Sequence, residues 1–256
     1  MKWKLEGGNC RHGEPTRAQI STQFLHALVE QSFRLRVSSI YGLISFGSDV
    51  KVLRELTAMS SEFTESLKEI KPAGKTLLYD ALKVAKKMLT DIYYPEEDDD
   101  LPYPKAKLRI IVISDGMDNK SETLPVTLAN EFIENQIVVD TVLVSTVDKN
   151  NEMCALSKLT GGLCFQPQNT KEGLKIFEQE AFLNINMRHL DVPHKEEVTQ
   201  EVLDEKASRF NKYDKNAENQ DLSSAKISID LAAPLYMCYL YQKERKINTM
   251  KVRRSL

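Results

Sequence analysis

The sequence is poor in cysteine and has no long hydrophobic run. Its 256 residues include only four cysteines, at Cys10, Cys154, Cys164 and Cys238. No two of them form a C-x-x-C pair, so the set is too small for a disulfide scaffold and wrongly spaced for a structural zinc site. The longest late apolar stretch, Leu231–Leu240, is about half as long as a bilayer requires and contains Pro234. We therefore predict no membrane partner, and we expect Cys154 and Cys164 to be small apolar packing residues.

An excess of charge of either sign is also missing. Lys and Arg number 35 against 37 Asp and Glu, which gives a net charge of −2. No global positive field therefore marks a nucleic-acid partner. The first eight residues lack the apolar segment of a secretory signal. We predict an intracellular, cytoplasmic protein.

The composition is otherwise that of a globular protein, with 41% hydrophobic and 28% charged residues. We predict one domain over residues 1–188 and a polar linker or tail over residues 189–256. The tail has a weak apolar island at residues 231–241, and its last fifteen residues carry six basic side chains and one acidic side chain. Residues 94–104 hold five consecutive acidic residues and three prolines, which predicts an exposed acidic loop.

Within the domain, helical and strand-like patterns alternate along the chain. The clearest strand is Leu108–Ser114, which is almost continuously apolar, as expected for a strand covered by helices on both faces. We expect further strands at residues 37–46, 50–56, 137–144 and 162–166. We expect helices at residues 17–33, 61–70, 77–89, 124–136, 153–159 and 171–187. This order predicts an α/β fold, with a doubly wound, mostly parallel sheet and helices on both faces.

The common catalytic motifs are absent. Gly74-Lys75-Thr76 resembles the end of a phosphate-binding loop, but that motif requires a glycine at position 69, where Glu69 stands, and a strand before it. The patterns GxGxxG, HExxH and GxSxG do not occur. We therefore predict that the chain is not an enzyme, with a hydrolase or phosphoryl-transfer enzyme as the less favoured alternative.

Two oxygen-bearing residues stand where the carboxyl ends of strands and the start of a helix should meet. Thr76 comes just before an apolar helix, so its hydroxyl either caps that helix or binds a ligand. Asp115 follows a buried strand and either belongs to a turn or binds a ligand at the same edge. A hydroxyl and a carboxylate that meet there suit a hard cation such as Mg²⁺.

Four segments, taken in order, resemble the von Willebrand factor A-type domain family. They are Tyr41–Ser48, Gly74–Leu82, Ile110–Gly116 and Ala155–Gly162. The resemblance extends over residues 16–187 and implies a central sheet flanked by helices and a role in protein interaction. It often also implies a metal-ion-dependent adhesion site at the top edge of the sheet.

The family builds that site from an Asp-x-Ser-x-Ser loop, a threonine and a later aspartate. Thr76 matches the threonine and Asp115 matches the aspartate. Glu6–Cys10 stands where the loop belongs and offers Glu for Asp, with Gly and Cys for the serines. Met1–Leu5 is too short and too charged for a central strand. Two explanations remain open, a degenerate site in an intact protein or a chain that begins inside the domain.

From the resemblance we predict a protein-interaction module with an incomplete or degenerate metal site. In this hypothesis Mg²⁺ at Thr76 and Asp115 accepts a carboxylate of a partner protein. Metal-independent recognition by the same face is an alternative. A further alternative is an assembly adaptor in a larger intracellular complex, which uses the acidic loop and the basic tail.

Overall fold

The computed structural model describes residues 16–35, 37, 39–70, 76–93, 107–114, 118–144, 150–167, 169–182 and 194–212. The elements follow the order α1 (Arg17–Arg34), β1 (Tyr41–Phe46), β2 (Val50–Thr57), α2 (Ser60–Ser66), η1 (Leu67–Glu69), α3 (Leu78–Tyr93), β3 (Leu108–Ser114), α4 (Pro125–Glu134), β4 (Ile137–Leu143), α5 (Asn151–Leu159), β5 (Cys164–Phe165), α6 (Thr170–Phe182) and α7 (Gln200–Lys212). The acidic loop at residues 94–104 lies outside the described residues.

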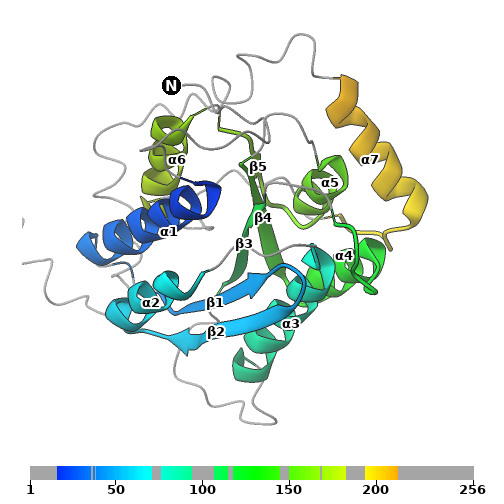
Figure 1. Cartoon of the computed structure of the whole chain (residues 1–256). Helices are drawn as coiled ribbons and strands as arrows, with labels where there is room; N and C mark the ends of the chain where they lie inside the picture. Colours follow the sequence, from blue (N-terminus) through cyan, green and yellow to red (C-terminus); the bar gives the residue numbers. More distant parts are fainter. Residues whose placement is uncertain are drawn as a thin grey trace, which may run out of the picture.

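The strands of the described chain form two sheets (Figure 1). β1 and β2 form an antiparallel hairpin, in which Tyr41 lies opposite Thr57. β3, β4 and β5 form a parallel sheet in that order. β4 is buried along its whole length, whereas β3 alternates buried and half-buried residues. The half-buried residues of β3 stand at alternate positions and therefore share one face of the sheet, which is less fully covered at β3 than at β4.

Helices cover both faces of the parallel sheet. On one face, Phe24 of α1 and Phe177 of α6 pack with Val142 and Val144, and their rings stack with centroids 5.1 Å apart. On the other face, α3, α4 and α5 bury a larger cluster against β3 and β4, centred on Leu78, Phe132, Val139, Met153 and Leu156. The predicted α/β class, with a mostly parallel sheet between helices, is confirmed.

Local sequence signals explain where several helices begin. The Thr16 side chain accepts a hydrogen bond from the Gln19 backbone N–H, and the Gln19 side chain accepts one from the Thr16 N–H. This reciprocal capping box satisfies two of the donors that a helix start leaves free. α5 also begins at a side-chain cap, because the Asn150 side chain accepts from the Met153 N–H.

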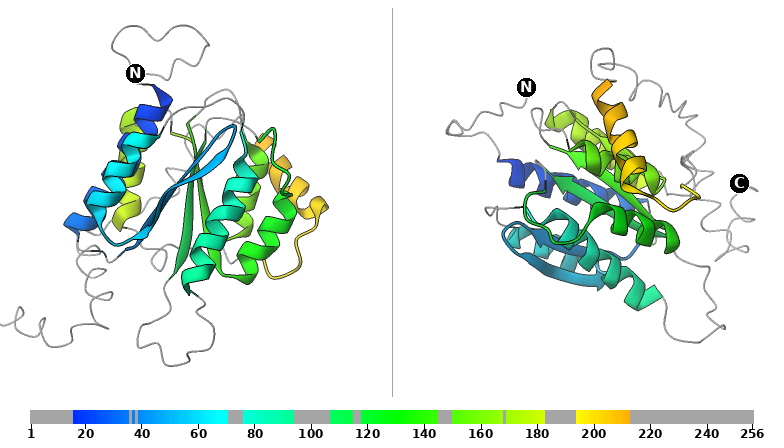
Figure 2. Two further views of the ribbon diagram at one scale, coloured as in Figure 1. Left: turned by 60° about the horizontal axis from the view of Figure 1, so that its bottom comes forward. Right: turned by 90° about the vertical axis from the view of Figure 1, so that its right-hand side faces the viewer.

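A helix lies inside the segment that the sequence predicts as a linker or tail. α7 packs on α5, and its Leu203 is fully buried in the same cluster as Phe132 and Leu156. The extended residues before it are fixed to α4, because the Asn130 side chain donates to the Val198 C=O and accepts from the Val198 N–H. Figure 2 shows α7 beside α5, on the side of the domain away from α1.

One expectation about the cysteines is wrong. Cys154 of α5 and Cys164 of β5 are not independent packing residues but form a disulfide bond. The two cysteines lie on consecutive elements that pack on β4, which brings their Cα atoms to 5.2 Å. No helix in the described ranges is both long and apolar enough to cross a membrane.

Candidate functional site

The carboxyl ends of β1 and β3, one strand from each sheet, meet at the start of α3. The Leu77 N–H donates to the Gly47 C=O at the end of β1, with an N···O distance of 3.1 Å. The neighbouring residue, Thr76, is bonded to the chain that follows β3 of the parallel sheet. The Asn119 N–H donates to the Thr76 C=O, with an N···O distance of 3.2 Å. The Asn119 side chain also accepts from the Thr76 N–H at 2.9 Å. β1 and β3 therefore end at the same edge and run in the same direction.

The loop after β3 caps the first turn of α3. The Asp118 carboxylate accepts from the Leu78 N–H at 2.7 Å. The Ser121 hydroxyl oxygen accepts from the Tyr79 N–H at 3.0 Å and from the Asp80 N–H at 3.1 Å, and its hydrogen is donated to Asp118 at 2.6 Å. The backbone donors that a helix start leaves free are thus satisfied by residues about forty positions later in the chain.

α3 also binds the loop after β3 through its own residue Asp80. Its carboxylate accepts from the backbone N–H groups of Glu122 and Thr123 and from the Thr123 hydroxyl, at 3.2, 3.0 and 2.6 Å. Burial alone would raise the pKa of Asp80. The hydrogen bonds from Thr123 and Glu122, together with the charge of Lys83, outweigh that effect and lower the pKa. The helix and the loop therefore hold each other in place.

A second contact ties α3 to α5 beneath this edge. The Tyr79 hydroxyl donates to the Glu152 carboxylate at 2.5 Å. Burial of the ring, and then the hydrogen bond to Glu152, raise the pKa of Tyr79, so the phenol keeps its proton and remains a donor.

The interlocked loop presents a mixed surface to solvent. Asn119, Lys120 and Glu122 are exposed. Leu124, the residue before α4, is 66% exposed, whereas the first residue of α4, Pro125, is buried. We call residues 118–124 the edge loop. It offers one large apolar side chain with polar and charged neighbours, on a backbone fixed by hydrogen bonds.

Of the predicted metal residues, Thr76 lies at this edge and Asp115 lies outside the described residues. The amides of the first turn of α3 bond to Asp118 and Ser121 rather than to the Thr76 hydroxyl, so the alternative of Thr76 as the helix cap is not supported. The Asp118 oxygens are already engaged by Leu78 and Ser121. The described residues include no group of three or more His, Cys, Asp or Glu side chains that could hold a metal. These donors alone do not make a metal site, and we derive no step through a metal.

Asp80, Asp118 and Ser121 were not predicted as site residues. Asp118 and Ser121 have the three-residue spacing of a helix start, but they cap α3, which precedes them in the chain. The spacing of Asp118 and Ser121 is therefore visible in the sequence. That they cap the earlier helix α3 is not visible there.

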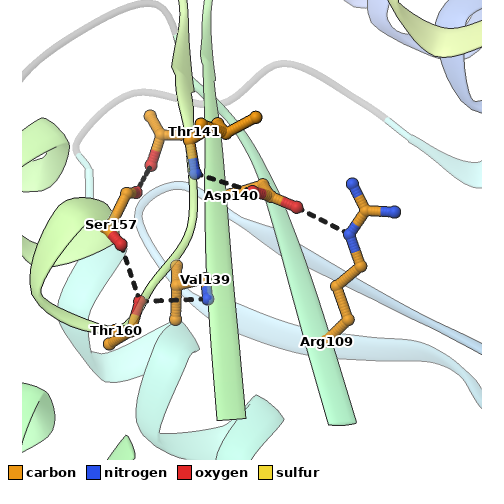
Figure 3. Close-up of polar contacts among 7 residues, drawn as sticks. Arg109, Val139, Asp140, Thr141, Ser157 and Thr160 are labelled. Carbon is orange, nitrogen blue, oxygen red and sulfur yellow. Dashed lines mark hydrogen bonds and ion pairs between the residues drawn. The ribbon is translucent and has the colours of Figure 1, made fainter. Parts of the chain in front are cut away.

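Away from this edge, a buried polar network stabilises the parallel sheet (Figure 3). The Arg109 guanidinium of β3 donates to the Asp140 carboxylate of β4 at 2.6 Å, and the Asp140 side chain is 1% exposed. The other Asp140 oxygen accepts from the Leu163 N–H at 2.8 Å. The Thr160 hydroxyl accepts from the Val139 N–H at 3.2 Å, which ties the end of α5 to β4. This network positions β5, and its role is structural.

Comparisons with known proteins agree with this architecture. A family model described as von Willebrand factor type A domain matches residues 7–117. The fold is similar to a von Willebrand factor type A structure from Catenulispora acidiphila, with a TM-score of 0.52, 14% identity, and coverage of 64% of this chain and 38% of that one. It is also similar to the SpRpn10 VWA domain, with a TM-score of 0.50, 15% identity, and coverage of 64% and 84%.

Another similar structure is proximal thread matrix protein 1 from the mussel byssus, with a zinc-occupied MIDAS motif. Its TM-score is 0.50 at 15% identity, with coverage of 66% of this chain and 41% of that one. At this identity the likeness shows the fold alone, and the metal belongs to that protein.

A relative in Acanthamoeba polyphaga mimivirus is named a probable bifunctional E2/E3 enzyme. It is 26% identical over 174 residues, and the match covers 68% of this chain and 13% of that protein. The prediction that the chain is not an enzyme is therefore contradicted, because the curated relative that it matches is named as an enzyme. The absence of GxGxxG, HExxH and GxSxG excludes only a few reaction classes and not enzymatic activity as such.

The match of residues 7–117, the sheet between two layers of helices and the similar solved structures agree with one another. Residues 7–117 therefore match the von Willebrand factor type A model, and the described residues have a fold similar to that of solved von Willebrand factor A domains.

Proposed function

We propose that this domain is the protein-recognition part of an E2/E3 enzyme, that is, of an enzyme for the conjugation and ligation of ubiquitin-type tags. Two findings support the proposal. The von Willebrand factor A domain is a type of protein-interaction module, and the mimivirus relative is named an E2/E3 enzyme. The match spans only 13% of that relative, so the domain supplies one part of such an enzyme.

The observation that carries the proposal is the edge loop. Leu124 is a large apolar side chain with 66% of its surface exposed, and Lys120 and Glu122 lie close to it in the loop. Interfaces commonly place an apolar anchor inside a polar rim. The hydrogen bonds of Asp80, Asp118 and Ser121 fix the loop before a partner arrives, which reduces the entropy lost on binding. We propose that a partner protein buries Leu124 and pairs with Lys120 or Glu122, in the cytoplasm.

Photo-crosslinking in cells tests this function directly. A photoreactive residue at position 122 of the full chain traps its partners, and the recovered complexes are assayed for ubiquitin transfer that depends on E1 and ATP. We expect transfer by the wild-type complexes and an at least tenfold lower yield of complex for Leu124→Asp.

A matched control is Lys175→Ala, an exposed residue of α6 on another side of the domain. This variant should behave as the wild type. Complexes without transfer activity would contradict the enzyme assignment, and an equal yield for Leu124→Asp would contradict the role of the edge loop.

A second candidate is recognition through Mg²⁺ held by Thr76 and Asp115. It is favoured by the place of Thr76 at the meeting point of the two sheets, and by the zinc-occupied MIDAS motif in a protein of similar fold. Calorimetric titration of the full chain with Mg²⁺ tests it. Binding heat that disappears in Asp115→Ala would support the metal, whereas no heat in the wild-type chain would contradict it.

A further inference from the structure

The disulfide bond between Cys154 and Cys164 joins a buried helix to a short strand. Cys154 belongs to α5 and Cys164 is the first residue of β5, ten positions later in the chain. Cys154 is only 4% exposed, whereas Cys164 is half-buried. Thiol–disulfide exchange requires that an attacking thiol reach one of the two sulfur atoms. Of the two cysteines, Cys164 is therefore the one that a thiol from solvent reaches first.

The helix end of this bond is held in place by contacts that involve no sulfur. The hydroxyl oxygens of Ser157 and Thr141 lie 2.7 Å apart (Figure 3), and the Gly162 N–H donates to the Ser157 C=O at 2.7 Å. Met153 and Leu156 of α5 are buried in the core cluster. We therefore expect α5 to stay on the sheet when the disulfide opens. Two thiols kept close together by the fold re-form their bond as an intramolecular pair.

The strand end of the bond has much weaker support. β5 is two residues long, and in the described part of the chain it pairs with β4 alone. Next to this pairing, the Thr141 N–H donates to the Leu163 C=O and the Leu163 N–H donates to the Asp140 carboxylate, both at 2.8 Å. Segments with few contacts open locally at a small fraction of the free energy of global unfolding. Loss of the covalent link therefore affects β5 more than α5.

We propose that Cys154 and Cys164 form a reversible redox site, at which a dithiol reductant opens the disulfide and loosens β5 while the rest of the domain stays folded. Disulfides that form in reducing compartments are commonly transient, which fits a site of this kind in the cytoplasm. The inference does not rest on the E2/E3 assignment.

The exchange proceeds in two steps. A thiolate of the reductant attacks the Sγ atom of Cys164, so that a bond between reductant and Cys164 forms and the bond to Cys154 breaks. The Cys154 thiolate leaves and takes a proton from water. The second thiol of the reductant then displaces Cys164, which is protonated in turn. The protein gains two electrons and two protons, and the reductant becomes a disulfide. A small disulfide such as oxidised glutathione reverses both steps.

Residue-resolved hydrogen exchange on the full chain, before and after treatment with dithiothreitol under native conditions, tests the effect on β5. Alkylation and peptide mass spectrometry measure how much of the pair is reduced. We expect exchange at the Thr141 and Leu163 amides to become at least tenfold faster on reduction and to slow again with oxidised glutathione. The Val144 N–H, which donates to the Ser114 C=O on the β3 side of β4, is the internal control and should not change.

Two pairs of substitutions make this test specific. The double variant Cys154→Ser, Cys164→Ser should exchange like the reduced wild-type chain, with or without dithiothreitol. The matched control, Cys10→Ser with Cys238→Ser, removes the other two cysteines and should respond as the wild type does. A pair that resists reduction in the native chain would overturn the proposal, and so would unchanged exchange at Thr141 and Leu163. Faster exchange at Val144 as well would also overturn it, because the disulfide would then hold the whole sheet together.

The order of the two steps has its own measurement. A thioredoxin-type protein whose second active-site cysteine is replaced by serine completes only the first step and remains bound to the chain as a mixed disulfide. Peptide mapping of the trapped complex should place that bond on Cys164. A mixed disulfide on Cys154 would contradict the proposed attack, and failure of oxidised glutathione to re-form the Cys154–Cys164 bond would contradict its reversibility.

Discussion

Gly162 lies at the turn between α5 and β5, directly against the backbone of β4. A Cβ atom at this position would lie 1.9 Å from the Val139 carbonyl oxygen, so a side chain fits only if the backbone moves. We expect Gly162→Ala to lower the free energy of unfolding by about 4 kcal/mol, in the range of severe single substitutions. Denaturant unfolding of the full chain measures this.

Gly42→Ala is the matched control for that substitution. Its Cβ would meet the Met88 methyl group at 2.7 Å, which is the far end of a flexible side chain. We expect a loss below about 1 kcal/mol, because Met88 has room to change its rotamer. Equal losses for the two variants would show that the turn does not approach β4 as described.

The lowered pKa of Asp80 makes the stability of the folded chain depend on pH. Its pKa in the folded chain lies below the ordinary value of 3.8, because the hydrogen bonds from Thr123 and Glu122 outweigh the cost of burial. A lowered pKa stabilises the fold above the ordinary pKa, and that contribution is lost as the pH falls through the folded-state value. Asp80→Asn should therefore be less stable than the wild-type chain at pH 6, and the difference should shrink below about pH 4. Thermal unfolding at both pH values checks this, and a difference independent of pH would contradict it.

At the scale of elements, α7 belongs to the folded domain rather than to a free tail. Its Leu203 is fully buried among residues of α4 and α5. We expect Leu203→Ala to cost about 3 kcal/mol, as for other large-to-small substitutions in a core. Glu205→Ala, an exposed position on the same helix, should change stability by less than about 0.5 kcal/mol. Urea unfolding separates the two, and similar small effects would mean that α7 leaves the domain in solution.

The helices and strands themselves follow from local patterns. The continuous apolar run of Leu108–Ser114 predicts β3 at its observed bounds, and the helical spacing in residues 17–33 predicts α1 to within one residue. α7 was not expected, because its polar composition hides a single buried face that includes Leu203. Its burial depends on the packing of α7 on α5, which no local pattern shows.

At the scale of the whole molecule, the candidate site is harder to predict than the fold. Thr76 lies where β1 and β3 end, and its role as a metal ligand stays a prediction that rests on the convergence of the carboxyl ends of parallel strands. Asp80, Asp118 and Ser121 were not singled out, since each bonds to a partner about forty residues away. The disulfide between Cys154 and Cys164, only ten residues apart, was not predicted for a different reason, because it depends on how α5 and β5 pack on β4.

The edge loop and the start of α3 form one interlocked surface. Amides in the first turn of a helix normally exchange fast, because they lack partners within the helix. Here the Ser121 hydroxyl accepts from the Tyr79 and Asp80 amides, so hydrogen exchange at these two residues is the most direct measurement. We expect protected amides in the wild-type chain, at least tenfold faster exchange in Ser121→Ala and no change in the control Lys120→Ala. Unprotected amides in the wild-type chain, or protection that survives Ser121→Ala, would contradict it.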